Sequence, residues 1–246
     1  LLNGNQTGAI IFYYILKAWQ ENNRFQGNEY IVSTIVTSPI MEKIAHHFKV
    51  NYYKTLTGFK HIAKVIREKE GTEKFVCGGE ESYGYMLGDY ARDKDGIASC
   101  AVVAEMTAWA AENKKSLFDV LMDIYMEIGF YKEHMVPLVR KGRSGAEEIT
   151  QMMVDYRNNP PKALAGSNVE KVFDYQEQTI LDVKTGTKTA IEGFPKSNVL
   201  QYITEDGSEV SVRPSGTEPK IKFYMSVNAP LNSKAEFDKV DAVLDN

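Results

Sequence analysis

The segment RPSGTEPK, which begins at Arg213, combines the residue types that bind phosphate groups. Arg213 offers a planar fork of donors that suits phosphate oxygens. Ser215 and Thr217 add hydroxyl groups, and Gly216 lets the backbone come close to a ligand. We expect these residues to form an anion-binding turn, because backbone amides in such a turn can also point at the anion. A hairpin turn with an ordinary surface arginine is the alternative, and the short motif alone does not separate the two.

A second segment, GGEESYGY, begins at Gly78 and carries two carboxylates and a hydroxyl group. Glu80 and Ser82 could exchange hydrogen bonds with the hydroxyls of a sugar. We expect Gly78 and Gly79 to form a turn that ends a strand running from Lys74 to Cys77. A solvated acidic loop is the alternative for this segment.

Two shorter segments could contribute a cation and backbone donors. RDKDG ends at Gly96 and invites a calcium-loop interpretation, but its glycine falls at the fourth position, whereas an EF-hand needs it at the sixth. We therefore interpret Lys94 as a flexible cation for an anionic group. TLTGFK places Thr57 and Gly58 just before a predicted helix, where free amides can bind an anion or a hydroxyl.

Other common catalytic and metal-binding motifs do not occur. The four histidines have no zinc spacing with Cys77 or Cys100, and the sequence lacks a Walker motif, GxGxxG and GxSxG. We predict no metal site in this chain. Two cysteines in a chain of this length are typical of reduced thiols in a cytosolic protein.

The overall composition is that of a folded globular protein and excludes several classes of partner. The chain has 246 residues, of which 43% are hydrophobic and 25% charged. A formal net charge of −4 argues against a general nucleic-acid binder. The apolar stretch AIIFYYIL is far shorter than the roughly 20 residues of a membrane span. We expect a cytoplasmic protein with no nucleic-acid or membrane partner.

The first half of the sequence alternates strand and helix patterns. We predict helices from Thr7 to about Asn22, from Gly58 to Glu70 and from Gly96 to about Asn113, the last notably apolar. Buried strands between helices of this length indicate βαβ units and a mostly parallel sheet. Ligands bind at the carboxyl ends of the strands in such sheets, where the segments with Thr57 and Glu80 lie.

After Gly129 the pattern changes to short strands separated by Gly, Asn and Pro. This is typical of a smaller α+β domain with an antiparallel sheet, beginning near Tyr131. The predicted fold class is α/β: a three-layer domain with a mixed, mostly parallel sheet at residues 1–130, followed by the smaller α+β domain at residues 131–246.

Five segments, GNQTG (from Gly4), TLTGFK, GGEESYGY, RDKDG and RPSGTEPK, resemble in this order and spacing the C-terminal half of the α-D-phosphohexomutases. This family includes phosphoglucomutase and phosphomannomutase. The resemblance covers nearly the whole chain, and the combination of EESYGY with RDKDG is most similar to the bacterial α-phosphoglucomutases. It implies a four-domain enzyme of which this chain holds the third and fourth domains.

The resemblance implies roles for five residues of the first domain. Glu80 and Ser82 would bind the hydroxyls of the sugar, and Lys94 would lie near the reacting or bound phosphate. Thr57 and Gly58 would help to choose the orientation of the sugar.

In the second domain the resemblance implies a site for the phosphate that is not transferred, formed by Arg213, Ser215, Gly216 and Thr217. The family often carries an arginine shortly after this segment. Lys222 stands there in this sequence, which leaves its role open.

The family's phosphate-carrying serine lies in a TASHNP-like loop and its Mg²⁺ in a DxDxDR-like loop, and neither occurs in this sequence. The resemblance implies an isomerase that converts hexose 1-phosphate to hexose 6-phosphate through a phosphoserine and a hexose 1,6-bisphosphate. The catalytic serine and the Mg²⁺ ligands would lie outside this chain, which would be inactive alone. Its partners would be a small-molecule sugar phosphate and the N-terminal domains of the same protein.

Two alternatives remain open from the sequence. The parent protein could prefer mannose or pentose phosphates, since Glu80 and Ser82 do not distinguish these sugars from glucose. The chain could instead be a free-standing phosphosugar-binding module. Its start directly at GNQTG, where the family's third domain begins, favours the enzyme fragment.

Overall fold

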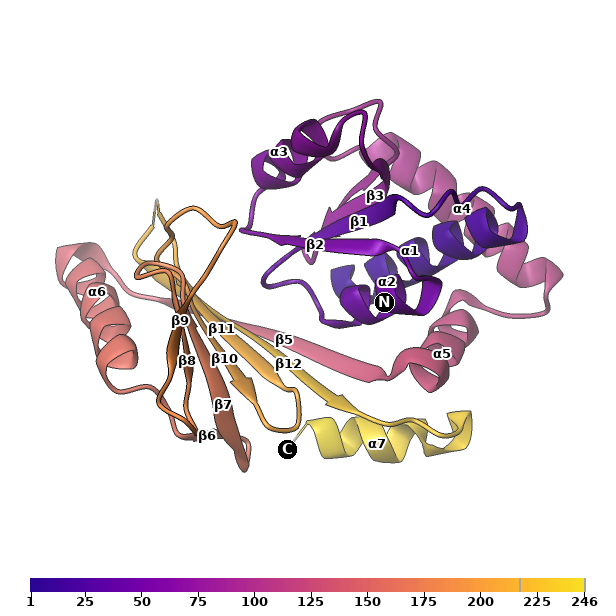
Figure 1. The fold of residues 1–246 in the computed structure, drawn as a ribbon. Coiled ribbons are helices and arrows are strands. Elements are labelled where there is room, and N and C mark those ends of the chain that lie inside the picture. Colours follow the sequence, from indigo (N-terminus) through magenta and orange to yellow (C-terminus); the bar gives the residue numbers. More distant parts are fainter. Residues whose placement is uncertain (217, 246) are drawn as a thin grey trace. The chain divides into compact units, whose positions relative to one another are not determined.

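The computed structural model describes residues 1–216 and 218–245, and the chain divides into two compact units (Figure 1). The first unit contains residues 1–131 and 229–240, and the second contains residues 132–228 and 241–246.

The first unit contains a four-stranded sheet in the order β2-β1-β3-β4. The first three strands are mutually parallel, and β4 is antiparallel to β3. The elements along the chain are α1 (Gly4–Glu21), β1 (Glu29–Thr34), α2 (Ile40–Phe48), β2 (Asn51–Thr55), α3 (Phe59–Lys69), β3 (Lys74–Glu80), β4 (Gly84–Leu87), α4 (Gly96–Glu112) and α5 (Leu117–Ile128).

Helices cover both faces of this sheet, with α3 on one side and α1 and α2 on the other (Figure 1). Every residue of β1 is buried because both faces are covered. Tyr30 and Val32 pack with Phe59, Ile62 and Ile66 of α3 in one apolar cluster. The prediction of a three-layer domain with a mixed, mostly parallel sheet is therefore confirmed.

The first helix starts at Gly4, so the prediction that it begins at Thr7 was wrong. Asn3 is the N-cap: its side chain accepts a hydrogen bond from the Gln6 amide, and the Gln6 side chain accepts one from the Asn3 amide. This reciprocal pair is a capping box, which satisfies two amides at the helix start. The segment GNQTG is consequently the first turn of α1.

The prediction of a turn at Gly78 and Gly79 was also wrong, because β3 continues through both glycines to Glu80. A Cβ at Gly78 would lie 3.0 Å from the Val32 carbonyl oxygen, and a Cβ at Gly79 would lie 2.7 Å from the Tyr85 ring. The glycines therefore allow close packing within the sheet. The turn lies beyond them, between β3 and β4.

The apolar helix α4 is confirmed, but most of its surface is accessible. Only Ser99, Met106 and Ala110 are buried in the described structure, and Ile97 is 87% exposed. α4 lacks an amphipathic pattern, which would have placed polar residues on its outer face.

The second unit is built on an antiparallel sheet, as predicted, with the strand order β5-β12-β11-β10-β7-β8-β9 and β6 paired with β7. Helix α6 packs on one face through Ile149 and Met153, which share an apolar cluster with Tyr202. The elements are β5 (Phe130–Val139), α6 (Gly142–Asn158), β6 (Ala163–Leu164), β7 (Ser167–Asp174), β8 (Thr179–Asp182), β9 (Lys188–Ala190), β10 (Leu200–Thr204), β11 (Glu209–Pro214) and β12 (Lys220–Ala229).

Residues 229–240 belong to the first unit, although they follow the whole antiparallel sheet in sequence. They include the short 3₁₀ helix Lys234–Glu236 and the start of α7 (Phe237–Leu244). The Phe237 ring contacts those of Phe118 and Phe130, with centroids 5.4 and 5.3 Å apart. Aromatic packing therefore attaches this segment to the first unit.

Cys77 is buried and Cys100 exposed, and both are free thiols. In the described part of the chain, none of the helices combines the length and apolar character that a membrane span requires.

Candidate functional site

The residues predicted to bind a ligand in the first unit follow the carboxyl ends of two parallel strands. Thr57 and Gly58 come shortly after β2, Glu80 is the last residue of β3, and Ser82 lies in the turn that follows. Since β2 and β3 are both parallel to β1, these ends lie at the same edge of the sheet. In this sheet β2 lies on one side of β1 and β3 lies on the other, so the strand order reverses between β1 and β3. The carboxyl ends of the strands at such a switch point commonly form a ligand crevice.

A hydrogen bond joins two of these segments directly. The Gly58 amide donates to Glu80 Oε1 over 2.6 Å. Glu80 is only 9% exposed, so this contact satisfies a carboxylate that is largely removed from water. Because Gly58 is the N-cap of α3, the negative charge also lies at the positive end of the helix dipole.

Lys94 lies over the start of α3 and the β3–β4 hairpin. Its Nζ is 4.8 Å from the centroid of the Phe59 ring and 3.0 Å from Asp93 Oδ1. A Cβ at Gly84 would lie 2.8 Å from Lys94 Cδ and 3.2 Å from the Phe59 ring, so the glycine provides space for both. Lys94 is thereby placed beside the Gly58 turn and the hairpin, with about half of its side chain exposed.

The acidic residues of the RDKDG segment have local structural roles. The Asp95 side chain caps α4 by accepting a hydrogen bond from the Ala98 amide. The backbone amide of Asp95 donates to the Tyr85 carbonyl. The Lys94 amide and ammonium group both donate to Asp93 and hold the pKa of that carboxyl below its usual value. Across residues 1–216 and 218–245, no group of three or more His, Cys, Asp or Glu side chains is arranged to hold a metal ion.

In the second unit, Arg213 and Lys222 are directly opposite each other in the β11–β12 ladder. Residues opposite each other in antiparallel strands point to the same face, and like charges in this arrangement destabilise the sheet. Among the described residues, neither side chain forms an ion pair with a carboxylate. Two cations placed in this way raise the local positive potential, which would attract an anion.

The backbone after Arg213 is held by hydrogen bonds at its base. The Ser215 amide donates to the Lys220 carbonyl over 2.7 Å, and the Arg140 amide donates to the Pro219 carbonyl over 2.9 Å. A Cβ at Gly216 would meet no atom within 4 Å, so this part of the turn is open. Thr217, the fourth predicted phosphate-binding residue, lies outside the described residues.

Two features of the candidate site residues were not predicted from the sequence. The contact between Glu80 and Gly58 joins residues 22 positions apart, and no local pattern marks it. The position of Lys222 opposite Arg213 could have been found from the sequence, because the alternating segments SEVSV and IKFYMSV on either side of RPSGTEPK are typical of two strands joined by a hairpin turn.

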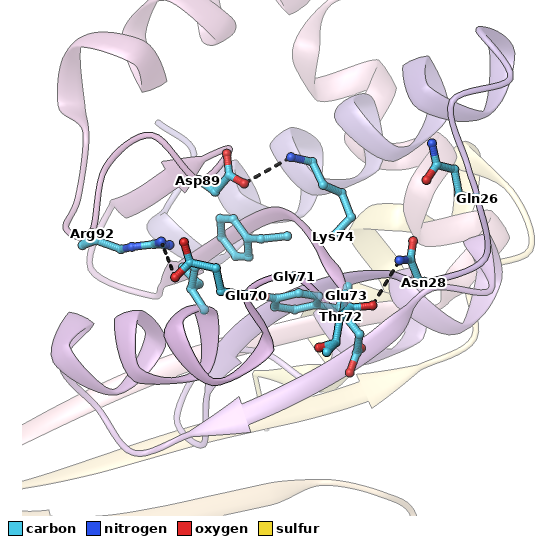
Figure 2. Close-up of a pocket in the computed structure, with 12 residues that line it drawn as sticks. Gln26, Asn28, Glu70, Gly71, Thr72, Glu73, Lys74, Asp89 and Arg92 are labelled. Carbon is cyan, nitrogen blue, oxygen red and sulfur yellow. Dashed lines mark hydrogen bonds and ion pairs between the residues drawn. The ribbon is translucent and has the colours of Figure 1, made fainter.

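A hollow of about 270 Å³ lies at the opposite end of the strands of the first sheet, near the amino ends of β1 and β3 (Figure 2). Its cations are paired: Lys74 lies 3.1 Å from Asp89, and Arg92 lies 3.5 Å from Glu70. Asn28 donates a hydrogen bond to the Thr72 carbonyl at its rim. None of the predicted ligand-binding residues lines this hollow.

Two family models match this chain. The model for phosphoglucomutase/phosphomannomutase alpha/beta/alpha domain III matches residues 3–128, and the model for the phosphoglucomutase/phosphomannomutase C-terminal domain matches residues 159–244.

Curated relatives include a phosphoglucomutase of Staphylococcus haemolyticus, which is 36% identical over 92% of this chain and 40% of its own length. A phosphoglucomutase of Staphylococcus aureus is 32% identical over 98% of this chain and 43% of its own length. The chain thus spans about two fifths of the length of these relatives.

Solved structures share the fold at low sequence identity. The Paramecium phosphoprotein pp63/parafusin, a phosphoglucomutase in its open form, matches 99% of this chain with a TM-score of 0.63 and 16% identity, over 40% of its own chain. A phosphoglucomutase/phosphomannomutase family protein from Burkholderia thailandensis matches 98% of this chain with a TM-score of 0.55 and 14% identity, also over 40% of its own chain. With both family models matching in order, the chain belongs to the phosphoglucomutase/phosphomannomutase family and corresponds to its domain III and C-terminal domain.

Proposed function

We propose that this chain is the substrate-holding part of a phosphoglucomutase, an enzyme that interconverts glucose 1-phosphate and glucose 6-phosphate. The observation that carries the proposal is the like-charge pair of Arg213 and Lys222 beside an open turn, since this arrangement is unfavourable without an anion. The choice of glucose rests on the EESYGY and RDKDG segments and on the phosphoglucomutase relatives.

In this proposal the first unit binds the sugar. Glu80 and Ser82 form hydrogen bonds with its hydroxyls, while Thr57 and Gly58 help to select its orientation. Lys94 neutralises charge on a phosphate group near the sugar. The proposed sugar-binding domain covers residues 1–130.

The second unit binds the phosphate that is not transferred, within a proposed domain at residues 131–246. Arg213 donates from its guanidinium group, Ser215, Gly216 and Thr217 donate from the turn, and Lys222 adds a second cation. Several charge-assisted hydrogen bonds, each worth roughly 1.5–3 kcal/mol, would fix a phosphate group.

The transfer step uses a phosphoserine outside this chain. A sugar hydroxyl displaces the serine oxygen at phosphorus, giving a hexose 1,6-bisphosphate and free serine. The serine then takes the other phosphoryl group, so the phosphate has changed position and the enzyme is rephosphorylated. The DxDxDR-like loop that the family resemblance associates with Mg²⁺ does not occur in the sequence, so we place the Mg²⁺ ligands outside this chain and derive no metal step from its residues.

Amide chemical shifts of the purified chain test the two assignments separately. Inorganic phosphate should perturb the amides of Ser215 and Gly216, and glucose should perturb those of Gly58 and Ser82. Glucose 1,6-bisphosphate, which carries both the sugar and phosphate groups, should perturb both sets of amides. Shifts confined to the hollow near Lys74, or no shifts with any of the three ligands, would contradict the proposed function.

A further inference from the structure

We propose that Glu80 is a positioning residue whose carboxylate holds the Gly58 amide and so keeps the turn before α3 in the conformation that receives the sugar. The role in receiving the sugar rests on the proposed function. The hydrogen bond between the Gly58 amide and Glu80 is a feature of the structure and does not depend on it. Glu80 thereby links the two predicted sugar-binding segments within the first unit.

The Glu80 carboxylate lies in an environment that is largely removed from water. Glu80 lies at the end of β3 with 9% of its surface exposed, and its Oε1 accepts from the Gly58 amide over 2.6 Å. Within residues 1–216 and 218–245, no lysine, arginine or histidine forms an ion pair with it. A carboxylate so far removed from water needs hydrogen-bond donors, and the Gly58 amide supplies one.

The turn before α3 has a backbone conformation that depends on glycine. Gly58 has a φ of 109°, which residues with a Cβ rarely adopt. Its carbonyl accepts a hydrogen bond from the His61 amide inside the helix over 2.9 Å, and its amide points out of the helix to Glu80. The turn is therefore fixed on its helix side by the backbone and on its outer side by Glu80.

The Glu80 carboxylate can accept further hydrogen bonds. Two oxygens provide about four acceptor positions, and the Gly58 amide uses one of them. A sugar hydroxyl can thus bind to Glu80 while the contact with Gly58 is kept. Because Phe59 follows Gly58 and lies under Lys94, a shift of the turn would also move the surface on which the Lys94 cation rests.

Hydrogen exchange of the Gly58 amide, measured by NMR without ligand, tests the positioning role directly. We expect Glu80→Ala to accelerate exchange at Gly58 by about tenfold or more, because a charge-assisted hydrogen bond is lost. Glu80→Gln keeps an acceptor oxygen at the end of a side chain of the same length, so it should retain most of the protection. The buried Ile31 amide reports global opening, and its exchange in each variant measures any change in global stability.

The matched control is Glu70→Ala, which removes an exposed carboxylate at the other end of the same helix and should leave exchange at Gly58 unchanged. Equal exchange at Gly58 in the wild type and in Glu80→Ala would overturn the proposal. If Glu80→Ala does not fold, the Gly58 proton shift in Glu80→Gln serves instead: it should move upfield as the charge is lost, and an unchanged shift would overturn the proposal.

The exchange experiment does not depend on the proposed function, because no ligand is present. The affinity for glucose 1-phosphate is a second readout, and it does depend on the proposed function. Glu80→Gln should bind glucose 1-phosphate more tightly than Glu80→Ala, because it restores the hydrogen bond that holds the turn. If the wild-type chain binds no glucose 1-phosphate but the exchange pattern is as expected, the proposed function fails and the role of Glu80 in fixing the turn stands.

Discussion

At the scale of single residues, Arg213 and Lys222 carry the clearest electrostatic signal in this chain. Their register places two positive side chains on one face of adjacent strands. A cross-strand pair of like charges costs up to about 1 kcal/mol, and a bound anion would reverse the sign of that interaction. The pair therefore lowers the stability of the ligand-free sheet, and in the proposed function a bound phosphate relieves this repulsion.

We predict that Arg213→Ala weakens binding of glucose 1,6-bisphosphate by about tenfold or more, the loss of one or two charge-assisted hydrogen bonds. The melting temperature should barely change or should rise slightly, because the substitution relieves repulsion with Lys222. Calorimetric titration and thermal unfolding measure the two effects. Arg143→Ala is the control, since Arg143 is 94% exposed on α6 and should affect neither. A fall in stability with unchanged affinity would show that Arg213 is structural.

At the scale of secondary-structure elements, the first helix and the β3–β4 hairpin are in direct backbone contact. A Cβ at Gly4 would lie 1.8 Å from the Glu81 carbonyl oxygen. The hairpin backbone cannot move away without disturbing the pairing of Glu80 with Gly84. Gly4 therefore permits the packing of α1 beside the turn that contains Ser82.

Two glycines at equivalent helix positions provide a matched test of this contact. Gly4 is the first residue of α1 and Gly96 the first residue of α4, where a Cβ would meet nothing within 4 Å. We expect Gly4→Ala to destabilise the first unit by about 1–3 kcal/mol or more, as overpacking does. Gly96→Ala should be neutral or stabilising by up to about 1 kcal/mol. Denaturant unfolding measures both, and equal stabilities for the two variants would contradict the contact.

Glu73 connects three elements of the first unit at the start of β3. Its carboxylate accepts hydrogen bonds from Lys69 of α3 and from Asn51 and Tyr53 of β2. Partial burial by itself raises the pKa of Glu73, but these hydrogen bonds outweigh it and hold the pKa below its usual value. The ionised form is thus favoured in the folded protein.

We predict that Glu73→Gln lowers the melting temperature at neutral pH and that its difference from the wild type shrinks in acid. A pKa that is lower in the folded state contributes stability above the unfolded value, and that contribution is lost as the pH falls through the folded value. Thermal unfolding of both proteins between pH 7 and the acid limit of folding measures the difference. A gap that stays constant over this range would contradict the lowered pKa.

At the scale of the whole molecule, the proposed binding residues lie in both of the two units, and the chain spans about two fifths of the length of its curated relatives. The TASHNP-like and DxDxDR-like loops that the family resemblance associates with phosphoryl transfer do not occur in it. The proposed function is therefore one of holding the substrate.

We predict that the purified chain does not convert glucose 1-phosphate to glucose 6-phosphate at any Mg²⁺ concentration, because it lacks the serine that carries the phosphoryl group. A coupled assay for glucose 6-phosphate measures this, with the full-length Staphylococcus haemolyticus phosphoglucomutase as the positive control. Robust turnover by the chain alone would contradict the proposed division between holding and transfer.

The linear pattern of residues was enough to predict the classes of structure in both units and the chemical types of the candidate residues. Alternating buried strands and amphipathic helices indicate a parallel sheet, because each helix such as α3 must bury one apolar face. The arginine, hydroxyl and glycine residues from Arg213 onward indicate an anion site, because their donor chemistry is local to the segment. These properties depend on neighbouring residues, so the linear pattern contains them.

The ends of the elements and the contacts between distant residues became apparent only in the folded chain. β3 continues through Gly78 and Gly79 because Val32 and Tyr85 pack against them, and no rule on glycine in turns contains that contact. The same holds for the Gly58 amide and Glu80, which the parallel order of β2, β1 and β3 brings within 2.6 Å. The free energy of such contacts depends on residues distant in sequence, and only the folded chain brings them together.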